Sequence, residues 1–209
     1  TRQVTGMTRA SVSAAVLIGG RSRRMGEPKA LLRLAEGSPT LVERTVATLR
    51  SVSGDVFLVA AAAWALPRPL RACPLVIDTG TSAADGIVTA LDSAGHRFCV
   101  VVACDMPFLD AALLREMGEL AVRTGRGVIA TDLRGGHPLH AVWDRESAPG
   151  IRAAIERNER SLGALARLGD LAPLDLDDPG RSDTDRWSVF NVNTPDDLAL
   201  ARAHAGNGW

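Results

Sequence analysis

The fold is most strongly constrained by the stretch Leu17-Ile18-Gly19-Gly20-Arg21-Ser22-Arg23-Arg24-Met25-Gly26-Glu27-Pro28-Lys29. It continues a short apolar run that begins at Ala14 and is typical of a buried β-strand. Two consecutive glycines then allow a tight turn and a close approach of the backbone to a ligand. Three arginines and Lys29 place four cations within nine residues. Such a turn suits a polyphosphate, because backbone N–H groups can form an anion-binding nest while the cations neutralise charge.

The spacing of this stretch differs from the common phosphate-binding motifs. Five residues separate Gly20 from Gly26, and Lys29 follows three positions later, so the Walker pattern is not met. The dinucleotide fingerprint G-x-G-x-x-G is absent as well. Taken alone, the glycines and arginines are equally consistent with a surface loop whose arginines are solvated.

Length and composition restrict the class of protein. The 209 residues predict one globular domain over residues 13–209, preceded by a loose polar tail over residues 1–12. The formal net charge is zero and aromatic residues make up 4%, which argues against a nucleic-acid or membrane-surface binder. No apolar stretch reaches about 18 residues, so no membrane span is expected. The three cysteines form no C-x-x-C pair and are expected to be reduced core residues of a cytoplasmic protein.

Apolar runs alternate with helical patterns along the chain, which predicts βα units and a mainly parallel sheet. Strands are expected at residues 14–18, 56–60, 75–77, 98–103 and 127–130, with an antiparallel strand over 139–143 at the sheet edge. Helix starts are predicted by the capping boxes at Thr40 and Ser82, by Asp110 and by Thr194-Pro195. Two more helical stretches are expected near 148–158 and 161–168, and the acidic segment 175–185 is expected to be a solvated loop. The pattern predicts a three-layer α/β/α fold with a Rossmann-like sheet.

Asp105 follows directly after the apolar run 98–103, whose nearly continuous hydrophobicity predicts a central strand. Ligands of open α/β sheets bind in the crevice outside the carboxyl ends of the strands, and Ile18 delivers the glycine turn to the same rim. A carboxylate opposite a basic phosphate loop suits Mg²⁺, which prefers one or two carboxylates together with substrate phosphates. Asp105 is therefore the candidate metal ligand, and the structural alternative is a loop aspartate before a proline turn.

Other positions are candidates for contacts with substrate. Asp78 ends another apolar run and would lie at the same rim, unless it only serves a turn. Lys29 would act as a point charge that stabilises the negative charge developed during transfer, with Arg24 a weaker candidate. Asn191 and Asn193 alternate along an extended segment and so face the same side, where they either read a polar ligand or tie down a loop.

The stretch that begins at Leu17 resembles the signature of the molybdenum cofactor guanylyltransferase family, L-x-G-G-x-S-x-R-M-G-x-x-K. Three later segments resemble the same family in the same order, namely Cys104-Asp105-Met106-Pro107, Pro138-Leu139-His140-Ala141-Val142-Trp143 and Asn191-Val192-Asn193-Thr194-Pro195-Asp196-Asp197-Leu198. The resemblance spans about residues 13–205. It implies a nucleotidyltransferase that moves GMP from GTP to the terminal phosphate of molybdopterin and releases pyrophosphate, with Mg²⁺ as cofactor.

The resemblance also implies which residues serve each substrate. Nucleotide binding falls on Leu17, Ile18, Gly19, Gly20, Ser22, Met25, Gly26, Lys29, Asp78 and Asp105. Molybdopterin binding falls on Asn191 and Asn193. Catalysis falls on Lys29, Asp105 and Arg24, with Asp105 holding the metal. Transient contacts with proteins that deliver or receive the cofactor are expected.

The chain departs from the family pattern in two places. Where the family has Gly-Pro-Leu-x-Gly-Ile, this chain has Ser82-Ala83-Ala84-Asp85-Gly86-Ile87, and an expected asparagine is replaced by Ala60 or Ala61. The Gly19-Gly20 pair favours the guanylyl branch, since the cytidylyl enzymes tend to have Ala-Gly. The departures leave two alternatives open, namely a related transferase that uses CTP or another acceptor, and a nucleotide-binding or partner-docking module without activity. His137 and His140 lie beside the predicted hairpin. For both, a structural role and a role facing the substrate are possible.

Overall fold

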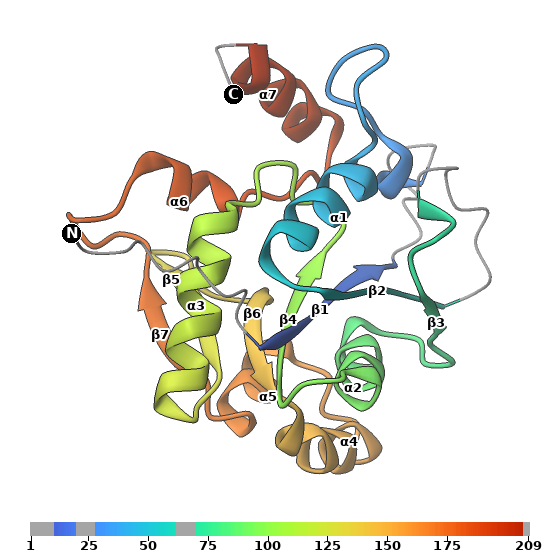
Figure 1. Ribbon diagram of the computed structural model, residues 1–209, viewed down its shortest axis with the longest axis vertical. Helices are drawn as coiled ribbons and strands as arrows, with labels where there is room; N and C mark the ends of the chain where they lie inside the picture. Colours follow the sequence, from blue (N-terminus) through green and yellow to red (C-terminus); the bar gives the residue numbers. More distant parts are fainter. Residues whose placement is uncertain (1–10, 20–27, 62–69, 207–209) are drawn as a thin grey trace, which may run out of the picture.

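A twisted sheet of seven strands forms the centre of the molecule (Figure 1). The computed structural model describes residues 11–19, 28–61 and 70–206. The strand order is β3-β2-β1-β4-β6-β5-β7, and only β6 runs antiparallel to its two neighbours. The strands are β1 (Val12–Ile18), β2 (Asp55–Ala60), β3 (Leu75–Ile77), β4 (Phe98–Ala103), β5 (Val128–Asp132), β6 (Gly135–Asp144) and β7 (Ala172–Asp175).

Helices cover both faces of this sheet, which confirms the predicted three-layer α/β/α architecture. One face packs against α1 (Leu41–Val52) and α3 (Ala111–Thr124), and the other against α2 (Ala83–Ser93), α4 (Ala148–Glu156) and α5 (Leu162–Leu168). Two further helices, α6 (Asp183–Ser188) and α7 (Pro195–Gly206), follow β7. Short 3-10 turns occupy Lys29–Leu31 and Arg145–Ser147. Among the described helices none combines the length and apolar character that a membrane span requires.

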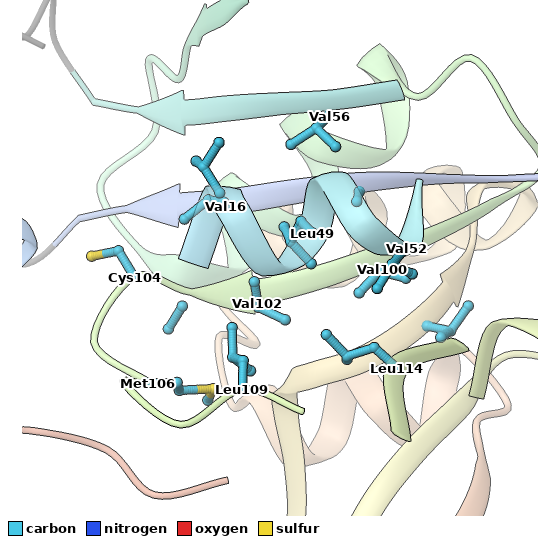
Figure 2. Packing of buried hydrophobic residues seen from close by; sticks show 14 of the residues in the cluster. Val16, Leu49, Val52, Val56, Val100, Val102, Cys104, Met106, Leu109 and Leu114 are labelled. Carbon is cyan, nitrogen blue, oxygen red and sulfur yellow. The ribbon is translucent and has the colours of Figure 1, made fainter. Parts of the chain in front are cut away.

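Strand β4 lies at the centre of the sheet, as its apolar sequence predicts, and all six of its residues are buried. On one face, Leu49 and Val52 of α1 pack over Val16, Val56 and Val100 of three adjacent strands (Figure 2). Burial of such side chains contributes roughly 1.5–3 kcal/mol each. This core fixes the strands in register, so that the ends of β1 and β4 meet at one rim.

The helix starts occur where the cap residues predict them. Thr40 and Ser82 each accept a hydrogen bond from the backbone three residues later, and Glu43 and Asp85 complete the two capping boxes. Asp110 caps α3, which ends at Gly125 in the left-handed conformation, φ 69°. These contacts satisfy backbone groups that would otherwise lack partners.

Two expectations from the sequence are wrong. The antiparallel strand β6 lies inside the sheet between β4 and β5, not at its edge, and the central residues Ala141, Val142 and Trp143 are fully buried. A continuous apolar run of this kind is covered on both faces, which is a property of internal strands. The segment 175–185 is not a loop throughout, because β7 ends within it and α6 begins within it.

Candidate functional site

A cavity of about 510 Å³ opens at the rim where β1, β2 and β4 end. It lies where ligands bind in open α/β sheets. Most of the residues predicted to contact substrate line it, namely Leu17, Ile18, Gly19, Asp78, Asp105, Asn191 and Asn193. The predicted contacts at Gly20, Ser22, Arg24, Met25 and Gly26 lie outside the described residues.

Two backbone hydrogen bonds draw the walls of this cavity together. The N–H of Cys104 donates to the carbonyl oxygen of Leu17 at 3.2 Å, which joins the end of β4 to the end of β1. The N–H of Val192 donates to the carbonyl oxygen of Asp105 at 2.9 Å. The second bond places the segment around Val192 beside Asp105, although 87 positions separate them in the sequence.

Lys29 connects the end of the basic stretch to the acidic corner after β4. Its Nζ donates to Oδ2 of Asp105 at 3.1 Å and to Oδ1 of Asn193 at 2.7 Å. The side chains of Lys29 and Asp105 are 18% and 17% exposed, so the pair stays accessible to a ligand. Lys29 is also the only lysine in the chain, among 24 Lys and Arg residues. The three residues that the sequence assigns to phosphate, metal and acceptor therefore meet at one point.

Asn193 is held by the start of α7. The backbone N–H groups of Asn193 and Thr194 donate to Oδ2 of Asp197 at 2.9 and 2.8 Å. Burial disfavours the charged form of Asp197, but these bonds and the nearby Lys29 hold the pKa of its carboxyl below the ordinary value. The carboxylate remains ionised, and the amide of Asn193 is fixed opposite Lys29. Asn191 lies on the same side of the segment, as its spacing predicts.

Asp78 is buried at the other end of the cavity. Its Oδ1 accepts hydrogen bonds from the N–H of Gly80 at 2.9 Å and from Oγ1 of Thr89 at 3.0 Å. Within the described part of the chain, Oδ2 has no such bond, and it faces the small residue Gly86. One oxygen of Asp78 therefore fixes a turn, and the other remains available to a ligand.

The wall beside Asp78 contains the stretch that departs from the family pattern. Asp85 accepts hydrogen bonds from the N–H groups of Thr81 and Ser82 at 3.0 and 2.9 Å, and from Nη1 of Arg160 at 2.9 Å. Burial opposes ionisation of Asp85, but the bonds from Ser82 and Thr81 and the guanidinium of Arg160 hold its pKa below the ordinary value. The substituted stretch thus forms a turn that hydrogen bonds hold in place. At the second departure, where the family has an asparagine, Ala60 and Ala61 line the cavity.

The two histidines of β6 have different surroundings. His137 lines the cavity, with Nε2 3.1 Å from Oδ2 of Asp132. His140 is fully buried away from it, with Nε2 2.7 Å from Oγ of Ser188. Sequence reasoning left both roles open and did not single out Asp132. The pairing of β5 with β6 brings Asp132 and His137 together.

The donor set at Asp105 fits Mg²⁺ bound with a substrate phosphate. Lys29 occupies Oδ2, and Oδ1 makes no hydrogen bond within the described residues. Residues 11–19, 28–61 and 70–206 contain no group of three or more histidine, cysteine, aspartate or glutamate side chains that could together hold a metal ion. A protein that offers one carboxylate leaves the other positions to phosphate oxygens and water, which is the coordination that Mg²⁺ accepts most readily.

Comparisons with known proteins identify the family of the chain. The sequence profile of the MobA-like NTP transferase domain matches residues 14–171. A protein of Mycobacterium marinum named "Probable molybdenum cofactor guanylyltransferase" is 34% identical to this chain over 193 residues, and the match covers 90% of this chain and 92% of the relative. In Pelotomaculum thermopropionicum the identity is 35% over 199 residues, with 92% of each covered.

Solved structures share the fold. The molybdopterin-guanine dinucleotide biosynthesis protein A of Archaeoglobus fulgidus has a TM-score of 0.77 at 24% identity, with 94% of this chain and 100% of that chain covered. The 2-C-methyl-D-erythritol 4-phosphate cytidylyltransferase of Thermus thermophilus has a TM-score of 0.65 at 20% identity, with 94% and 99% covered. At these identities the likeness concerns the fold alone.

Proposed function

The chain belongs to the MobA-like NTP transferase family, and from this premise we propose that it transfers GMP from GTP to the phosphate of molybdopterin. The observation that carries the proposal is the contact of Lys29 with Asp105 and Asn193, two residues that line the cavity. The names of relatives with 34% and 35% identity support the choice of substrates.

The reaction needs positioning and charge neutralisation more than proton transfer. An oxygen of the acceptor phosphate attacks the α-phosphorus of GTP, and the bond from that phosphorus to the bridging oxygen of the β-phosphate breaks. Pyrophosphate leaves with the electron pair of that bond. Because the acceptor oxygen is already an anion, no general base is required, and fixed positive charge stabilises the transition state.

The two substrates would meet at Lys29. We assign the nucleoside to the end of the cavity at Asp78, whose Oδ2 is available to accept a hydrogen bond. The backbone at Gly19, with the basic stretch that follows, would bind the phosphates, and Lys29 would neutralise charge passing to pyrophosphate. Asn191 and Asn193 would bind the acceptor. Asp105 would hold Mg²⁺, which would neutralise the charge of the phosphates and keep their oxygens in place.

The proposal extends to the setting of the reaction. The cysteines within the described residues are all unpaired and buried, in keeping with a cytoplasmic enzyme. We also propose transient contacts with the proteins that supply molybdopterin and receive the dinucleotide.

Release of pyrophosphate in the presence of molybdopterin, Mg²⁺ and one nucleotide at a time tests the proposal. We expect release with GTP and none with ATP or UTP. Release with CTP alone would replace GTP by CTP, which is the first alternative. A rise in melting temperature with GTP but no pyrophosphate would favour the second alternative, a nucleotide-binding module, since a ligand that binds only the folded state stabilises it.

A further inference from the structure

Residues 137–139 of β6 leave the regular pairing of the sheet beside the cavity. Ile129 of β5 pairs with Ala141 of β6, but the next pair toward the hairpin joins Thr131 to Gly136. One residue of β5 therefore stands opposite the four residues 137–140. Bulges of this kind re-aim side chains and are over-represented beside active sites.

The bulged segment is also unpaired on the side of β4, where a side-chain hydrogen bond holds it in place. Strand β6 pairs with β4 only as far as His140, so residues 137–139 belong to neither ladder. Pro138 has no N–H to contribute to a ladder, and its carbonyl oxygen accepts a hydrogen bond from Nε1 of the fully buried Trp143 at 3.1 Å. Residues 136–139 all line the cavity. The segment is therefore a fixed wall rather than a free loop.

Asp132 lies within ion-pair distance of the imidazole on this wall. Its Oδ2 lies 3.1 Å from Nε2 of His137, and Oδ2 also accepts a hydrogen bond from Nε of Arg134 at 2.9 Å. Burial opposes ionisation of Asp132, but the hydrogen bonds from the side chain and backbone of Arg134 hold the pKa of its carboxyl below the ordinary value. An ionised carboxylate facing Nε2 favours the tautomer with the proton on Nε2.

The other ring nitrogen is left for a ligand. Nε2 of His137 is buried and lies within ion-pair distance of Asp132, although it makes no hydrogen bond to a described residue. Nδ1 makes no hydrogen bond to a described residue either. In the Nε2–H tautomer of the neutral ring, Nδ1 is a hydrogen-bond acceptor. Pro138 and Leu139 beside it offer apolar surface. An acceptor nitrogen next to an apolar wall suits a flat heterocycle that carries N–H groups.

Building on the proposed function, we propose that residues 137–139 hold the pterin ring of the acceptor and that Nδ1 of His137 accepts one of its N–H groups. The strand order supports this assignment, because Asp78 follows β3 at one end of the rim and Asp105 follows β4 at its middle. His137, on β6, lies beyond Asp105 on the side opposite to Asp78. His137 is thus a positioning and specificity residue for the acceptor.

The test compares steady-state kinetics and GTP binding of the wild type with two variants at this position. His137→Phe keeps a flat ring but removes both nitrogens, and His137→Asn keeps an acceptor near the position of Nδ1. For His137→Phe we expect a rise of about tenfold in KM for molybdopterin, with kcat and the Kd of GTP changed less than about twofold. We expect His137→Asn to recover part of the loss. His96→Phe, an exposed histidine before β4, is the matched control.

Two results would overturn the inference. One is an unchanged KM for molybdopterin in His137→Phe, and the other is a weaker affinity for GTP in place of molybdopterin. Asp132→Asn provides an independent variant, for which we expect a smaller increase in the KM for molybdopterin. Every variant must show the melting curve of a folded protein. If the wild type forms no dinucleotide at all, the proposed function fails and the inference falls with it, whereas an active wild type with insensitive variants rejects the inference alone.

Discussion

At the scale of single residues, the site depends on one ammonium group placed between a carboxylate and an amide. Lys29 lies 3.1 Å from Asp105 and 2.7 Å from Asn193, at a position accessible to ligand. A partly exposed ion pair contributes little to folding stability, about 0–1 kcal/mol. Its value is therefore expected in catalysis, where a fixed charge acts on a developing anion.

Removal of either partner is expected to affect turnover far more than stability. We predict that Lys29→Ala and Asp105→Ala each lower kcat by on the order of a hundredfold or more, because each loses one preorganised charge-stabilising group. The melting temperature should change little. Single-turnover formation of pyrophosphate measures the effect. A near-normal rate for Asp105→Ala would count against its role as metal ligand.

The single lysine permits a direct test of where the triphosphate binds. An amine-reactive ester can modify only Lys29 and the α-amino group of this chain. We predict that GTP with Mg²⁺ slows modification of Lys29 by about tenfold or more, because bound phosphates cover the ammonium, while the α-amino group reacts at an unchanged rate. Mass spectrometry separates the two products. Equal protection of both groups, or of neither, would contradict this placement.

At the scale of elements, the wall beside Asp78 depends on a close approach between Gly80 and the first turn of α2. A Cβ atom at Gly80 would lie 2.1 Å from Cβ of Asp85. We predict that Gly80→Ala displaces Asp85 from its capping box and destabilises the fold by about 1–2 kcal/mol. GTP affinity should fall with it, because Gly80 also fixes Asp78.

Chemical unfolding and GTP titration of the same variant measure both effects. Gly54→Ala is a suitable control, because a Cβ there would have nothing within 4 Å. A Gly80→Ala protein with the stability and GTP affinity of the wild type would show that the turn has no part in shaping the cavity.

Local chemistry explains which elements could be predicted from the sequence. Capping boxes, a proline at a helix start and apolar runs act over a few residues, and the corresponding helices and strands occur where expected. The meeting of Lys29 with Asp105 could also be anticipated, because both follow parallel strands that end at one rim.

Pairings over long distances explain what could not be predicted. The place of β6 inside the sheet depends on its simultaneous match to β4 and β5. The contact of His137 with Asp132 depends on the bulge, which is a mismatch between two strands and has no pattern within either one. Strand β7 was missed because it is only four residues long and alternates buried and exposed positions incompletely.

At the scale of the whole molecule, a buried hydrogen-bonded contact joins three elements from distant parts of the chain. Oγ of Ser188 on α6 accepts a hydrogen bond from the N–H of Asp110 at 2.9 Å, and lies 2.7 Å from Nε2 of His140 on β6. A hydroxyl can accept two hydrogen bonds and donate one, so the tautomer of His140 decides which of the two groups donates. Burial lowers the pKa of His140 to about 4.

This buried histidine makes the stability of the fold depend on pH. In the unfolded chain His140 takes up a proton near its ordinary pKa of 6.5, whereas in the folded protein it does so only near about 4. Between these values the unfolded state binds more protons, so the free energy of unfolding falls as the pH falls. The full difference corresponds to about 3 kcal/mol. Carboxylates with lowered pKa, such as Asp85 and Asp197, add their losses only below about pH 4.5, since they stay ionised above it in both states.

We therefore predict that wild-type protein loses about 2 kcal/mol or more of stability to urea between about pH 6.5 and pH 4.5, and that His140→Gln loses much less over the same range. The glutamine retains a polar group for Ser188 but cannot titrate. His96→Gln, at an exposed site, should keep the wild-type dependence on pH. If His140→Gln followed the wild-type curve, protonation of His140 would not limit the fold at low pH, and the contact between β6, α6 and the start of α3 would have to tolerate a charged ring.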